Sequence, residues 1–106
     1  MAAAIAADPT SGTHLSTVFN ANVTGAPANT ATGYDTAKYP TEPAVVYYAT
    51  FTASGEDTLT SPLFSTNAGG SAAWLGVIIP SAGTWTLTLL DSADDSTVDT
   101  ATVVVS

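Results

Sequence analysis

Few residues of this 106-residue chain are suited to acid–base or metal chemistry: one histidine, nine carboxylates and no cysteine. A hydrolytic triad needs a histidine oriented beside a nucleophile. His14 lies in a turn-rich segment far from any plausible nucleophile in the sequence, and Lys38 is the only side chain with a fixed positive charge that could stabilise an oxyanion. We therefore expect no catalytic residue, no cofactor and no enzymatic activity.

The carboxylates fall in segments that are typical of turns. Glycoside hydrolysis needs two carboxyl groups facing each other across a cleft, whereas acids in turns are solvated. The segment Asp91–Asp99 carries four carboxylates, which are the oxygen ligands that calcium prefers, but it lacks the glycine and the distal glutamate of a helix–loop–helix calcium loop. We interpret it as a hairpin turn whose Asp side chains accept hydrogen bonds from their own backbone, and leave calcium binding open.

The charge balance excludes two classes of partner. The formal net charge is −8, with Lys38 as the only Lys or Arg residue. Binding of nucleic acid and of anionic lipid relies on Lys and Arg side chains, so we expect neither partner. The acidity either keeps the protein soluble by self-repulsion or attracts a basic partner surface.

The fold class follows from two apolar runs within Trp74–Leu90. Ser71–Ile79 is apolar on both faces, which predicts a strand buried on both sides. Thr84–Leu90 alternates threonine with Trp85, Leu87 and Leu89, which predicts one core face and one polar face. Further strands are expected at 15–23, 44–52, 58–65 and 98–105, with Pro62 placing its strand at an edge. About seven strands predict an all-β, antiparallel β-sandwich, either immunoglobulin-like or jelly-roll.

The segments outside these strands are the ones that we expect to contact partners. We expect residues 1–16 to form an extended N-terminal arm and residues 17–106 to form a single β-sandwich domain containing a long loop at 24–43. Long loops in compact domains are usually functional, so Tyr34, Lys38 and Tyr39 are our candidate partner-binding residues. Deleting residues 2–13 should then leave the domain folded and weaken assembly.

The run Pro80–Asp91, PSAGTWTLTLLD, resembles the penultimate strand of bacterial and viral immunoglobulin-like and jelly-roll accessory domains. A short, acidic, cysteine-free β-domain without a visible export signal also resembles the capsid decoration (cement) proteins of tailed bacteriophages. That resemblance implies a non-enzymatic structural protein, made in the host cytoplasm, that stabilises a virion by binding its shell. It implies the major capsid protein or another virion protein as partner and a homo-oligomer, for example a trimer.

Two other functions remain open on the sequence. One is an immunoglobulin-like adhesive or carbohydrate-binding module of a surface appendage or head fibre, which exposed Trp or Tyr side chains in a row on one sheet would favour. The other is an accessory domain of a secreted hydrolase.

Overall fold

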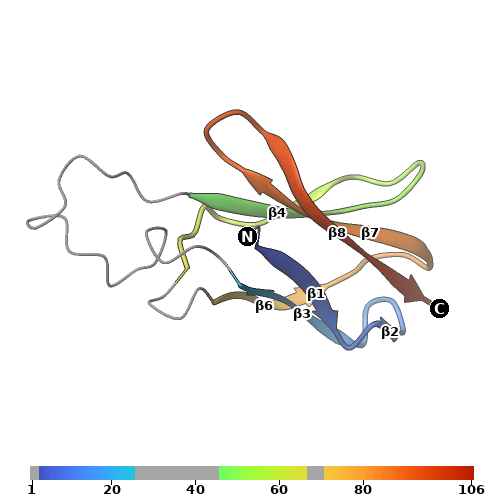
Figure 1. Cartoon of the computed structure of the whole chain (residues 1–106). Coiled ribbons are helices and arrows are strands. Elements are labelled where there is room, and N and C mark those ends of the chain that lie inside the picture. The colour runs from blue at the N-terminus through green and yellow to red at the C-terminus, as the bar shows by residue number, and fades with distance from the viewer. Residues whose placement is uncertain (1–2, 26–45, 67–70) are drawn as a thin grey trace, which may run out of the picture.

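The protein folds into β-strands arranged in two sheets (Figure 1). The computed structural model describes residues 3–25, 46–66 and 71–106, and contains no helix there. These residues form eight strands: β1 Ala4–Asp8, β2 Ser11–Gly12, β3 Val18–Thr24, β4 Tyr47–Thr52, β5 Leu59–Thr60, β6 Ala72–Ile78, β7 Gly83–Asp91 and β8 Ser96–Val105. The order is β1-β3-β6 in the three-stranded sheet and β2-β8-β7-β4-β5 in the five-stranded sheet. The all-β prediction is confirmed.

The centre of the five-stranded sheet is formed by β4, β7 and β8. β7 pairs antiparallel with both neighbours, from Tyr47↔Asp91 to Thr52↔Thr86 on one side and from Gly83↔Val105 to Asp91↔Ser96 on the other. The strict alternation of β7 buries every second side chain, as predicted from its period of two. The side chains that this sheet buries are those of Tyr47, Ala49, Phe51, Trp85, Leu87, Leu89, Val103 and Val105.

Trp85 is the largest fully buried side chain. Its indole Nε1–H donates a hydrogen bond to the carbonyl oxygen of Ser81 at 3.0 Å, four residues upstream. The ring therefore fills the core and also fixes the corner at which the chain enters β7. Buried indole N–H groups usually find such a partner.

The N-terminal segment contributes side chains to the core. The prediction that residues 1–16 form an extended arm is therefore wrong for β1 and β2, which are paired in the sheets. β1 pairs antiparallel with β3, from Ala4↔Thr24 to Asp8↔Asn20, and β2 pairs parallel with β8. Ala3, Ile5 and Ala7 are buried, whereas Ala4 and Ala6 are exposed. The alanine-rich run thus carries a strand alternation that its small side chains conceal, and the domain begins before residue 17.

β6 also differs from the prediction of a strand buried on both sides. It lies at an edge of the three-stranded sheet, and among the described residues β3 is its only strand partner. Its pairing shifts between Phe19↔Val77 and Ala21↔Trp74, and Gly76 has a φ of 76°, a conformation that glycine adopts readily. Across this bulge Trp74 packs on Phe51, with ring centroids 5.4 Å apart, while Leu75 is 68% exposed. β6 has apolar residues on both faces, but those on its outer face are exposed and not buried by a second layer of the described structure.

Candidate binding surface

The residues predicted to bind a partner, Tyr34, Lys38 and Tyr39, lie outside the described residues. Their role stays a prediction. His14 is described, and it holds the end of the chain: its backbone N–H and its ring Nδ1 both contact the carbonyl oxygen of Ser106, at 3.1 and 2.8 Å. These contacts give the histidine a structural role.

The acidic β7–β8 turn is built as the sequence suggested. The Asp91 carboxylate accepts a hydrogen bond from the N–H of Ala93 at 3.0 Å, and the Asp94 carboxylate accepts one from the N–H of Ser96 at 3.1 Å. The hydroxyl and then the backbone N–H of Ser96 lower the pKa of Asp94. Two of the carboxylates therefore cap their own backbone, as predicted. Within residues 3–25, 46–66 and 71–106, no three His, Asp or Glu side chains are grouped to hold a metal ion.

Tyr48, on β4, reaches this same turn. Its hydroxyl donates to Asp95 Oδ1 at 2.8 Å, and this hydrogen bond, with the negative charge of the carboxylate, raises the pKa of Tyr48. The Tyr48 hydroxyl is thus engaged within the domain.

A further carboxylate joins the two sheets. Asp99 lies on β8 of the five-stranded sheet, and its Oδ2 accepts the backbone N–H of Ile5, on β1 of the three-stranded sheet, at 2.8 Å. A β-bulge between Leu89 and Leu90 shifts the pairing of β8 just beside Asp99. The backbone N–H of Ile5 points away from the neighbouring strand β3, and the Asp99 side chain of the other sheet supplies its hydrogen-bond acceptor.

Exposed aliphatic side chains gather on the three-stranded sheet. Val18 of β3 and Ile78 of β6 are cross-strand partners that are 52% and 42% exposed. The backbone N–H of Leu15 donates to the carbonyl of Ile79 at 2.9 Å, and Leu15 and Leu75 are both mostly exposed. We call Leu15, Val18, Leu75 and Ile78 the apolar patch. It contains four of the six large hydrophobic side chains that are exposed among the described residues.

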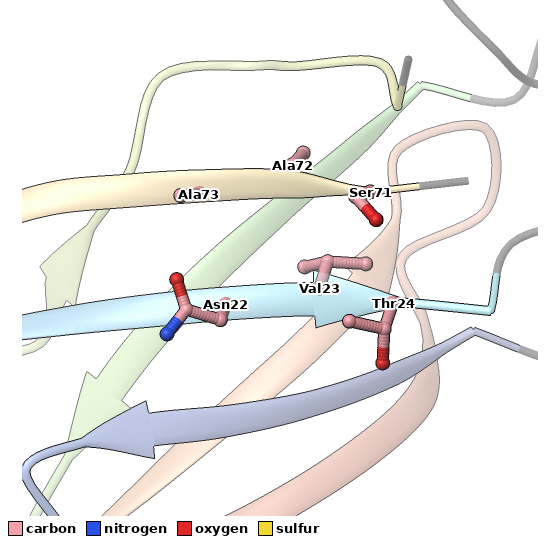
Figure 2. Close-up of a pocket in the computed structure, with 6 residues that line it drawn as sticks. All are labelled: Asn22, Val23, Thr24, Ser71, Ala72 and Ala73. Carbon is pink, nitrogen blue, oxygen red and sulfur yellow. The ribbon is translucent and has the colours of Figure 1, made fainter. Parts of the chain in front are cut away.

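Two hollows adjoin β6. The first, of about 410 Å³, lies where β3 and β6 run side by side (Figure 2), and is lined by Asn22, Val23, Thr24, Ser71, Ala72 and Ala73. The small side chains of β6 at this end leave the space open. The second, of about 260 Å³, lies between β6 and the segment that follows β5, and is lined by Ser61, Pro62, Phe64, Ala73, Trp74 and Leu75. Both hollows are bordered mainly by uncharged, apolar atoms.

The outer face of the five-stranded sheet is different in character. The registers place threonines in two rows across the strands. One row is Thr60, Thr50, Thr88 and Thr100, and the other is Thr52, Thr86 and Thr102. Threonine has a high β-propensity and pairs favourably across strands, so these rows stabilise the sheet while presenting a polar, uncharged face.

Known proteins offer no guide to these surfaces. No family model, curated protein or solved structure matches the chain. In the part of the chain that the structure describes, no helix has the length and hydropathy to cross a membrane. The assignment of a binding surface therefore rests on the geometry above.

The apolar patch was missed on the sequence because apolar residues on both faces of Ser71–Ile79 were interpreted as burial. One signal was available. Glycine in the interior of a strand often marks a bulge, and Gly76 stands in the middle of this run. A glycine bulge next to exposed aliphatic residues is typical of an edge strand, not of a central one.

Proposed function

We propose that this chain is a non-enzymatic structural protein of a virion, which decorates and stabilises a capsid by binding the shell surface. The supporting observation is the separation of charge from apolar surface. Six of the seven described carboxylates lie in the turns and strands of the five-stranded sheet or in the β4–β5 connection, and only Asp8 lies on the three-stranded sheet. The apolar patch occupies that second sheet, which suits it to contact a protein surface.

The strand order supports an immunoglobulin-like domain as the finer fold type. In immunoglobulin-like sandwiches one sheet contains strands A, B and E, and the other contains G, F and C, extended by C′ in variable-type domains. Taking β1, β3, β4, β5, β6, β7 and β8 as A, B, C, C′, E, F and G reproduces both sheets. The bond from Trp85, near the start of β7, to Ser81 is similar to the corner contact that a tyrosine makes at the start of strand F.

Such a domain is suited to binding and carries no implied chemistry. The partner would be the major capsid protein or another virion protein, with the decoration protein acting as a homo-oligomer on the capsid surface. Weak contacts made by one copy gain avidity when an oligomer engages several shell subunits at once.

The alternative, an adhesive or carbohydrate-binding immunoglobulin-like module, has less support. Among the described residues the rings of Phe19, Tyr47, Phe51 and Trp85 are buried, and the exposed large hydrophobic side chains are all aliphatic. A sugar-binding face relies on exposed rings, whereas protein contact does not.

The test is a binding assay with capsid shells of the virus that encodes the chain, stripped of accessory proteins. Purified protein is mixed with the shells, sedimented, and quantified per shell, and the heat stability of the shells is measured in parallel. Saturation at a fixed number of copies per shell together with more heat-resistant shells supports the proposal. Absence of co-sedimentation at protein concentrations up to the millimolar range, or binding of glycans instead, would overturn it.

A further inference from the structure

The turn between β2 and β3 contains a leucine in an unusual backbone conformation. Among the described residues, Leu15 and Asp95 are the non-glycine residues with a positive φ, at 59° and 58°. Asp adopts this left-handed conformation readily, because its short polar side chain bonds to the local backbone, whereas a bulky apolar residue adopts it at a cost. Asp95 is therefore an ordinary turn residue, and Leu15 is the exception.

Hydrogen bonds to both sheets hold the turn in this conformation. The N–H of Leu15 donates to the carbonyl of Ile79, just after β6, at 2.9 Å. The N–H of the preceding residue, His14, donates to the carbonyl of Ser106, just after β8, at 3.1 Å. The turn therefore joins the two sheets at the end of the domain where β8 ends (Figure 1).

The two threonines that flank the turn fix it further. The N–H of Thr17 donates to the carbonyl of Thr13 at 3.0 Å, and the N–H of Thr13 donates to the hydroxyl of Thr17 at 2.9 Å. Gly12 packs directly against Thr17, since a Cβ at position 12 would lie 2.6 Å from the Thr17 methyl carbon. The turn is thus preorganised, which lowers the cost of binding through a side chain that it carries.

The fold requires this backbone conformation, but it does not require leucine there. Glycine or asparagine would adopt the positive φ with less strain. The Leu15 side chain is 67% exposed, so it buries little surface in its own domain. Residues held in strained conformations cluster at functional sites, where the surrounding structure maintains them. A leucine that is both strained and exposed therefore indicates a contact outside the domain.

We propose that Leu15 is an anchor residue, which inserts into an apolar hollow on the surface of a shell subunit. The inference rests on the proposed function and names the residue that carries the contact. Val18 and Ile78, an exposed cross-strand pair, border the anchor: Val18 begins β3 three residues later, and Ile78 precedes Ile79. Interface hot spots have this arrangement, in which one side chain fills a pocket and its neighbours exclude water.

The size of this surface favours a partner that offers the same hollow many times. A stable contact between two proteins buries about 800 Å² on each of them, far more than Leu15, Val18 and Ile78 can supply. These side chains are therefore too few to hold two copies of this chain together as a stable dimer. A shell repeats one surface over many subunits, and the weak contacts that an oligomer makes at several of them combine into stable attachment.

The test compares three substitutions in the co-sedimentation assay with stripped shells. Leu15→Asn removes the apolar side chain, and asparagine tolerates the positive φ. Leu15→Met keeps an apolar side chain of similar volume at the same position. Leu63→Asn is the matched control, because Leu63 is 65% exposed and lies in the segment after β5, outside the apolar patch. Urea denaturation measures the stability of each variant.

We expect Leu15→Asn to bind shells at least about tenfold more weakly than the wild type, as for the loss of a hot-spot residue, and the other two variants to bind within about twofold of it. We also expect Leu15→Asn to unfold at the same urea concentration as the wild type or at a higher one, because the substitution relieves strain in the turn.

Leu15→Asn that binds as tightly as the wild type, or no more weakly than Leu63→Asn, would show that Leu15 is not the anchor. Loss of binding by Leu15→Met, which keeps the apolar contact, would also overturn the inference. A clearly lower urea midpoint for Leu15→Asn would mean that the side chain stabilises its own domain, which contradicts the argument from strain. In each of these cases the wild type still binds shells and the proposed function stands. A wild type that does not bind shells refutes the proposed function, and this inference with it.

Discussion

Replacing Trp85 tests the core on which both sheets depend. The side chain is 0% exposed, and its indole N–H donates to the carbonyl of Ser81. Truncation of such a residue to alanine costs about 3–5 kcal/mol, because it removes buried surface and leaves a cavity. Trp85→Phe keeps most of the ring and removes the hydrogen bond, which contributes about 1 kcal/mol. We therefore expect a large loss of stability for alanine and a markedly smaller one for phenylalanine.

Urea denaturation measures both effects, with the fluorescence of Trp74 as a probe that the substitutions leave in place. At an m-value of about 1–2 kcal/mol per molar urea, a loss of about 4 kcal/mol lowers the midpoint by about 2–4 M. Leu63→Ala is the control, since Leu63 is 65% exposed and should change stability by less than about 0.5 kcal/mol. A cost below 1 kcal/mol for Trp85→Ala would refute the assignment of Trp85 to the core.

Three further predictions concern the N-terminal strands and the acidic turn. Asp99→Ala should destabilise the domain by about 1–2 kcal/mol in thermal or urea unfolding, because the N–H of Ile5 loses a charged acceptor, and Asp99→Asn should lose less. Deleting residues 2–13 should abolish or severely weaken the cooperative unfolding transition, because it removes β1 and β2; a truncated chain as stable as the wild type would contradict this. Ser96→Ala should raise the pKa of Asp94 toward its ordinary value in an NMR titration. Because folding lowers that pKa, Asp94 stabilises the wild type above the pKa of the unfolded chain, and the effect is lost as the pH falls through the folded value.

The sequence predicted the parts of the fold in which alternation is strict. β7 was predicted because large apolar side chains recur at every second position, and β4 lies within the strand predicted at 44–52. β1 could not be recognised in the same way, since alanine marks a buried and an exposed face alike. The turn acids were predicted to cap their own backbone because Asp hydrogen-bonds local N–H groups in turns.

The candidate binding surface depends on information that a linear pattern does not contain. Whether an apolar strand is central or at an edge is decided by the strands beside it, and Ser71–Ile79 has the same pattern in either case. The long-range bond between Asp99 and Ile5 joins residues 94 positions apart, and no local motif predicts it. Edge protection is therefore visible only in the assembled sheets.

The proposed binding of the protein to a capsid shell is tested most directly by quantitative co-sedimentation of the purified protein with shells stripped of accessory proteins. The account predicts saturation at a fixed number of copies per shell. Absence of co-sedimentation at protein concentrations up to the millimolar range would contradict the account.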